Sequence, residues 1–166
     1  MYKPINSIYT VVKEITCLIN KYKYATGNKY TTSNNKYIIH SIGNILHEYY
    51  YDISKYNNYQ NYNKININTL YKNNYFCCNI WHIPYKSSYL SHYNTNTVFL
   101  LLQGNIKKYN YNNDLVIYNT YQSGDIIFNY KKENYNIVCN NKNIIGCHGE
   151  DFINNNHSII LEIALI

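Results

Sequence analysis

Apolar residues follow two different periods along the chain, and the period changes near residue 75. Between residues 7 and 24 they recur every three or four positions, which predicts a helix. A second helical pattern runs from Ser41, a suitable N-cap residue, to Ile53. The stretch 25–35 between them is rich in Asn, Thr and Ser, and we expect it to form a loop.

From Tyr75 onward, apolar residues occur in short runs or in alternation, as they do in β-strands. The run 97–102 ends at Gln103-Gly104, as a buried strand does where it meets a turn. Asn112-Asn113-Asp114 separates two strand-like segments and predicts a hairpin. We expect strands at 75–83, 97–102, 106–111, 115–121, 124–128, 135–139 and 158–166, with a turn at 84–88.

Two helices followed by closely spaced short strands predict a β-barrel or double-sheet sandwich with a helical lid. The length of 166 residues supports a single domain, 1–166, with a helical part at about 1–56 and a barrel at about 60–166. The start lacks the apolar stretch of a secretory signal, and no apolar run approaches the roughly 20 residues that cross a bilayer. We therefore expect a cytoplasmic protein without a membrane partner.

Composition adds little to this picture. The chain has 23 Tyr and 31 Asn, and its 15 basic residues are all Lys, which indicates an AT-rich genome. The net charge of +6 is carried by scattered Lys without the Arg that usually reads bases and phosphates. We therefore expect no nucleic-acid partner, although a basic nucleic-acid-binding barrel remains a third interpretation of the charge.

The five cysteines form neither a C-x-x-C pair nor an even set, so we expect no zinc knuckle and no disulfide framework. On a strand, Cys77 and Cys78 would place one thiol in a core and the other away from it. Of the histidines, we expect His40 and His47 on a helix surface, His82 at the surface of a strand, and His157 in a solvated loop.

One set of spacings is more specific. Trp81, Ser87-Ser88, His92 and the segment 101–107 together resemble the heart of the cysteine dioxygenases, which are cupin-fold thiol dioxygenases. The resemblance covers roughly residues 58–108. It implies a mainly β fold, a cupin-type β-barrel or double-sheet jelly roll with two N-terminal helices. It also implies Fe(II)-dependent oxidation of cysteine, or another small thiol, to its sulfinate with O₂.

The family holds Fe(II) with three His side chains, and the resemblance assigns two of them here. His92 takes the second ligand position and His148 the third, while strict spacing from Gly124 offers Tyr135 instead of His148. Leu90 occupies the first position, and its side chain cannot coordinate a metal. His82 or Tyr89 are the candidates for replacing the lost ligand.

On the substrate side, Tyr62 and Lys64 stand where the family has Tyr-x-Arg, so they would hold the substrate carboxylate. The family's Cys–Tyr cross-link falls on Thr97 and on Ala164 or Leu165, where it cannot form. Because of Leu90, two interpretations stay open: an active thiol dioxygenase, or an inactive cupin that serves as a small-molecule-binding or interaction module. The partners expected are a small thiol and O₂, and the chain is expected to be a monomer.

Overall fold

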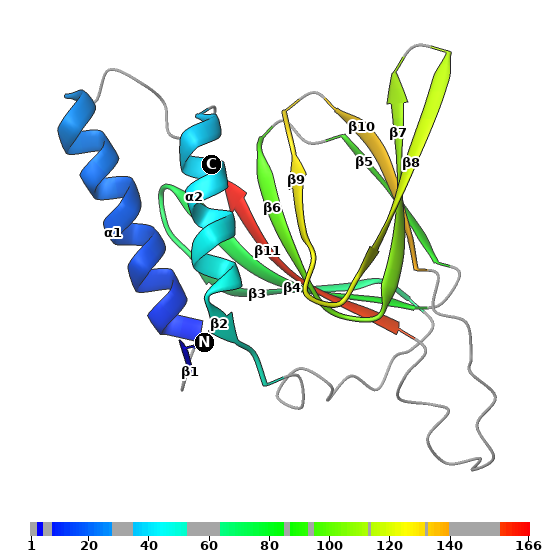
Figure 1. Cartoon of the computed structure of the whole chain (residues 1–166), viewed down its shortest axis with the longest axis horizontal. Helices are drawn as coiled ribbons and strands as arrows, with labels where there is room; N and C mark the ends of the chain where they lie inside the picture. Colours follow the sequence, from blue (N-terminus) through cyan, green and yellow to red (C-terminus); the bar gives the residue numbers. More distant parts are fainter. Residues whose placement is uncertain are drawn as a thin grey trace.

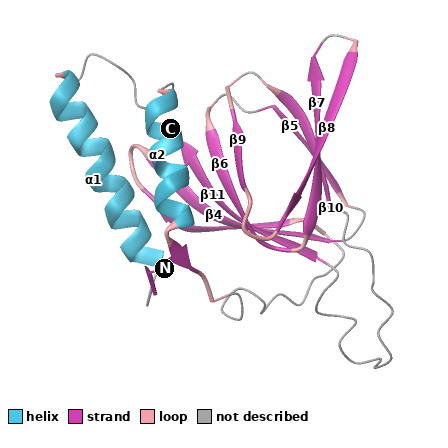
Figure 2. Ribbon diagram, in the orientation of Figure 1, coloured by secondary structure: helices cyan, strands magenta, loops and turns pink. Residues whose placement is uncertain are grey.

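The computed structural model describes residues 3–4, 8–27, 35–52, 64–84, 87–92, 95–112, 114–131, 133–139 and 157–166. Two helices, α1 (Ile8–Thr26) and α2 (Lys36–His47), lie side by side at one end of the molecule. Short strands β1 (Lys3–Pro4) and β2 (Tyr49–Tyr50) pair in parallel beside them. The other described strands form two sheets that face each other (Figures 1 and 2).

The sheet next to the helices has five strands in the order β3-β4-β11-β6-β9, and the far sheet has four in the order β5-β10-β7-β8. Neighbours in both sheets pair antiparallel. This mainly β double-sheet barrel with two N-terminal helices confirms the predicted fold class. The strands are β3 (Asn66–Lys72), β4 (Phe76–Pro84), β5 (Ser88–His92), β6 (Thr97–Gln103), β7 (Asn105–Asn112), β8 (Leu115–Gln122), β9 (Ile126–Asn129), β10 (Asn134–Cys139) and β11 (His157–Leu165).

The five-stranded sheet is buried on both faces, which explains why its central strands are nearly continuous apolar runs. Alternate residues point to opposite faces of a strand. On β6, Val98 and Leu100 therefore pack against the helices, whereas Phe99 and Leu101 pack inside the barrel. The molecule has two apolar cores, one on each side of this sheet.

The helical layer follows the predicted periodicity on α1, whose residues Val11, Ile15 and Ile19 are fully or almost fully buried. The prediction for α2 was wrong at both ends. Asn35, and not Ser41, is the N-cap, because its Oδ1 accepts hydrogen bonds from the backbone N–H groups of the first turn. The helix ends at His47, and the chain then enters β2.

Strands β3 and β5 had not been predicted as separate elements, because their apolar content is low. The other strand predictions, and the hairpin at 112–114 that joins β7 to β8, are confirmed. The end of this hairpin extends beyond the neighbouring strands (Figure 1). No helix in the described part of the chain has the length and apolar character needed to span a membrane.

Candidate ligand site in the barrel

The space between the two sheets is lined by residues that strand alternation points inward. Most are apolar: Trp81 packs edge-on against Tyr89, with ring centroids 4.9 Å apart, and lies 5.6 Å from the ring of Phe99. These rings belong to the apolar cluster that lies between the two sheets. Among the described residues, polar side chains between the sheets include one group around Glu162 and another around Lys108.

The first polar cluster is built on β4 and β11. Glu162 is 1% exposed, and its Oε2 accepts hydrogen bonds from Asn79 Nδ2 at 2.7 Å and from Trp81 Nε1 at 2.8 Å. Two N–H donors at these distances compensate much of the cost of burying a carboxylate. Glu162 therefore ties the inner faces of two neighbouring strands together.

The second polar cluster is built on Lys108 of β7. Lys108 is 3% exposed, yet within the described ranges its Nζ makes only long polar contacts: 3.3 Å to the carbonyl oxygen of Phe128 and 3.7 Å to Oε2 of Glu133. The same Nζ lies 4.8 Å from the ring centroid of Tyr135, a cation–π distance. Glu133 is 39% exposed, so the ion pair leads from the barrel interior to the surface.

Burial is the main influence on the pKa of Lys108, and it lowers that pKa because the charged ammonium loses water. The charge of Glu133 acts in the opposite direction and raises this pKa. An anion bound beside Nζ would be a second negative neighbour. Like Glu133, it would raise the pKa of Lys108 towards its usual value. The local electrostatics thus favour a negatively charged ligand group at this atom.

Two buried amide oxygens accompany Lys108. Asn110 follows it by two residues on the same face of β7, and Asn129 follows Phe128, whose carbonyl contacts Nζ. The Oδ1 atoms of both Asn residues have no hydrogen-bond partner among the described residues. Asn129 Nδ2 donates to Thr97 Oγ1 at 3.0 Å, which fixes the orientation of that amide. Acceptors and a cation therefore occur together in one part of the barrel.

The strand register shows where the predicted ligand positions lie. His92 on β5 lies opposite Asn134 of β10, and Ser91 lies opposite Tyr135. Residues directly opposite in an antiparallel pair share a face of the sheet. Tyr135 belongs to the barrel core. The assignment of His92 as a metal ligand stays a prediction.

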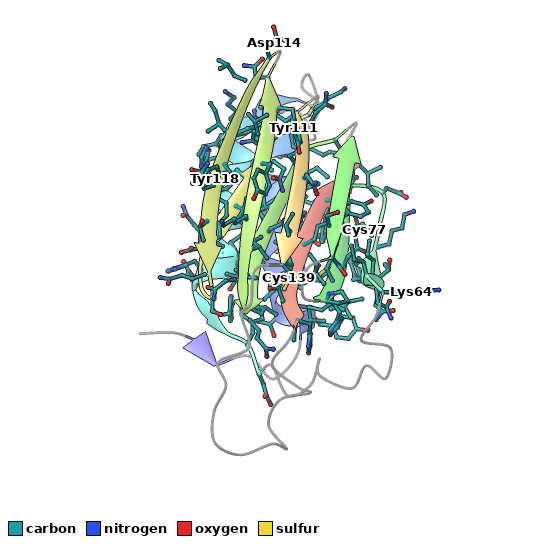
Figure 3. The ribbon with its side chains drawn as sticks, turned by 90° about the vertical axis from the view of Figure 1, so that its right-hand side faces the viewer. Lys64, Cys77, Tyr111, Asp114, Tyr118 and Cys139 are labelled. Carbon is teal, nitrogen blue, oxygen red and sulfur yellow. The ribbon has the colours of Figure 1, made fainter. Side chains whose placement is uncertain are left out.

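The other predicted site residues have separate outcomes. Tyr62 and His148 lie outside the described residues. Lys64 is exposed just before β3 (Figure 3). Tyr135 is fully buried in the barrel, beside Lys108. Within the described ranges, no group of three or more His, Cys, Asp or Glu residues comes together in a way that could hold a metal ion.

Two histidine predictions were wrong. His82 and His157 are both 4% exposed, and their ring centroids lie 5.7 Å apart. His157 opens β11 instead of lying in a solvated loop, and it pairs with Pro84 of β4. Alternation places both rings on the helix-facing side of the sheet, away from the barrel interior. His40 and His47 are exposed on α2, as predicted.

The two positions that the resemblance assigns to a cross-link are brought together by the fold. Thr97 on β6 lies directly opposite Ala164 on β11. Neither side chain can form a thioether, so the predicted absence of the bond follows from the residues themselves. Cys77 and Cys78 also behave as predicted: Cys78 is buried and burial raises its pKa to about 12, whereas Cys77 is partly exposed.

Comparison with known proteins supports the architecture. The chain superimposes on the Cupin 2 conserved barrel domain protein from Leptotrichia buccalis with a TM-score of 0.52, over 70% of this chain and 47% of that protein, at 13% identity. The chain has a cupin fold. A double-stranded β-helix protein from Klebsiella pneumoniae gives a TM-score of 0.48 at 11% identity, covering 70% of this chain and 88% of that one.

A cupin superfamily protein from Desulfitobacterium hafniense gives a TM-score of 0.46 at 16% identity, covering 65% of this chain and 83% of that one. No protein-family model matches the chain, and no curated protein sequence matches it. Likeness at these identities concerns the cupin fold alone.

Sequence reasoning missed Lys108, Asn129 and Glu162 as members of a site. Lys108 is one of 15 Lys and Asn129 one of 31 Asn, so composition gave neither any prominence. The available signal was position. Lys108 lies two residues after Ile106 on β7, so its side chain shares the inward face of that apolar residue. A charged residue at an inward position of a barrel strand is a candidate for function.

Proposed function

We propose that this cupin barrel binds a small amino-acid-like molecule, one that carries a carboxylate and an ammonium group, and that Lys108 is its main anchor. The observation that supports this proposal is the state of Lys108. A lysine that is 3% exposed would normally be held by short hydrogen bonds, whereas the polar contacts of Nζ here are 3.3 and 3.7 Å long. Donor capacity is therefore left for a ligand carboxylate.

The groups around Lys108 suggest what the rest of the ligand carries. Asn110 and Asn129 offer amide oxygens, and Glu133 offers a carboxylate, so this wall of the site accepts hydrogen bonds. An ammonium group supplies the donors that these atoms accept. The aromatic rings of the barrel would contact the rest of the ligand, which should therefore be an apolar or thiol-bearing side chain.

Cysteine belongs to this ligand class, which connects the proposal with the predicted thiol dioxygenase. That activity would need Fe(II), and its predicted ligands are His92, on β5, and His148, outside the described residues. The described residues fit an organic zwitterion and do not by themselves supply a three-ligand iron site. We therefore propose binding as the function, with oxidation as a separate question for the same experiment.

Trp81 provides the readout, because it is the single Trp of the chain and is buried in the barrel. We expect L-cysteine and L-alanine to change its fluorescence in a saturable way. Cysteamine, which lacks the carboxylate, should bind at least tenfold more weakly, since the loss of one charge-assisted contact costs about 1.5–3 kcal/mol. 3-Mercaptopropionate lacks the ammonium group and should also bind more weakly, because the oxygen atoms of Asn110, Asn129 and Glu133 then lose the donor that they accept from.

The matched pair of variants is Lys108→Met and Lys107→Met. Lys107 is adjacent on β7 but belongs to the opposite face, so its loss should leave binding unchanged, whereas Lys108→Met should abolish it. Equal binding by Lys108→Met and the wild type, or no binding of any zwitterion, would disprove the proposal. Anaerobic loading with Fe(II), followed by oxygen and a search for cysteinesulfinate, then decides whether bound cysteine is also oxidised.

A further inference from the structure

Strand β8 is an exposed sheet edge with an unusual surface. It forms the end of the four-stranded sheet and pairs with β7 alone. Four consecutive apolar residues at its start are each more than half exposed: Leu115 69%, Val116 56%, Ile117 57% and Tyr118 59%. They alternate between the two faces, so apolar surface lies on both sides of the strand as well as along its edge.

The other sheet edges carry features that discourage pairing, and β8 does not. Edge strand β9 has four residues and β5 has five. Edge strand β3 has a register shift between Thr69 and Tyr71 and ends in a lysine. Strand β8 has eight residues, a continuous register with β7, and no Pro or charged residue. Short length, irregularity and lysine are the usual means of protecting an edge, and β8 lacks all three.

In place of the monomer expected from the resemblance, we propose that β8 pairs with β8 of a second copy of this chain, antiparallel and about a two-fold axis, to form a homodimer. Residues opposite each other in a continuous sheet share a face. The two-fold axis must therefore pass between the two copies of one and the same residue, which then lie opposite each other. An axis at Val116 or Ile117 sets the apolar halves of the two strands against each other. The closed pair leaves neither β8 edge exposed, which explains why the strand needs no protection against open-ended association.

Charge favours the same arrangement. Asp114 lies at the exposed tip of the hairpin, next to β8 (Figure 3). With either axis, Asp114 of one copy falls opposite Tyr118 or Thr120 of the other. Lys107 of that other copy is paired with Thr120, and its Nζ lies 5.4 Å from the ring centroid of Tyr118. Two symmetric Asp114–Lys107 contacts therefore flank the apolar centre.

The surface fits a second copy better than a nucleic acid or a basic peptide. A nucleic acid needs a row of cations, and β8 has none between Leu115 and Gln122. Two copies of a chain with a net charge of +6 repel each other, so their contact should lie where the surface is uncharged or carries opposite charges in pairs. Strand β8 and its neighbours Asp114 and Lys107 meet both conditions.

The test is the mass of the protein in solution, measured by light scattering after size exclusion from micromolar to submillimolar concentration. We expect twice the mass of the chain for the wild type. Ile117→Lys should give a monomer, because it places a cation on each of the two apposed edges. The control is Tyr37→Lys, which makes the same change of charge at an exposed aromatic residue on α2 and should remain a dimer.

A charge exchange tests the two-fold arrangement itself. Asp114→Lys should raise the dimer dissociation constant roughly tenfold, since both flanking contacts are lost together. Adding Lys107→Asp to that variant should restore the wild-type value. A monomeric wild type at every concentration, a dimer that persists in Ile117→Lys, or a charge exchange that restores nothing would each overturn the proposal. Retained Trp81 fluorescence shows that each variant is folded.

Discussion

Glu162 and Lys108 are both buried in the barrel, but their surroundings differ. Glu162 accepts two N–H hydrogen bonds shorter than 2.9 Å, from Asn79 and Trp81, and these bonds link β4 to β11. Lys108 has longer contacts and an exposed counterion. The two hydrogen bonds to Oε2 of Glu162 indicate a structural role for that oxygen, whereas the long contacts of Lys108 indicate a group that awaits another partner.

His157 should make stability depend on pH. Burial lowers its pKa below the usual 6.5, and the nearby His82 lowers it further. As pH falls below about 6.5, the unfolded chain therefore takes up this proton before the folded chain does. The free energy of unfolding should be fully retained above that pH and should decrease below it, as urea titrations followed by Trp81 fluorescence would measure.

The variant His157→Gln should reduce this decrease, because it removes the proton-binding group. His47→Gln, at an exposed position on α2, is the matched control and should keep the wild-type dependence. An unchanged decrease in His157→Gln would show that another group carries the effect.

Helix α2 depends at its start on the side chain of Asn35. Its Oδ1 accepts hydrogen bonds from the N–H groups of Tyr37 and Ile38, at 2.8 and 3.4 Å. We expect Asn35→Ala to lower the free energy of unfolding by about 1 kcal/mol, the usual loss for an N-cap. Asn44→Ala, at an exposed position within the same helix, should change stability by a few tenths of a kcal/mol or even raise it slightly. Urea denaturation compares the two.

The cap also explains why α2 was predicted to start too late. Both Asn35 and Ser41 are good N-cap residues, and the chain has many Asn and Ser. The choice depends on Ile38 and Ile39, which are fully buried against the sheet and require a helical turn before Ser41. The start of α2 was therefore decided by the packing of this first turn against the sheet, which the local sequence pattern does not reveal.

At the scale of the whole molecule, the helical layer packs closely on the edge of the five-stranded sheet at Gly43. A Cβ added to Gly43 would lie 2.9 Å from Cζ of Phe128 and 3.3 Å from Cγ2 of Ile126, on β9. Gly43→Leu should therefore push α2 away from the sheet and lower the free energy of unfolding by about 1–3 kcal/mol or more. Chemical denaturation would measure this loss.

The matched control is Asn44→Leu, the next residue on the same helix, which is exposed and adds a similar side chain. It should leave the unfolding free energy nearly unchanged. Equal stability of the two variants would show that α2 can move on the sheet without cost.

Much of this fold could be predicted because its strands and its first helix carry strong local patterns. The continuous run of β6, the hairpin at 112–114 and the apolar stripe of α1 each depend on neighbours in the sequence. Strand β3 could not be recognised in this way. Its burial alternates only between partly buried and exposed, so its residues were free to be polar.

Local sequence patterns are enough to fix the class of fold, because periods of two and of three to four residues decide which faces of strands and helices become apolar. The composition of the site, by contrast, depends on how the strands pair in three dimensions. Strand register placed position 92 opposite Asn134 and not opposite Tyr135, and a shift of one residue would have exchanged the two faces. Register and facing contacts such as Lys108 with Tyr135 depend on how distant strands meet, which no single segment encodes.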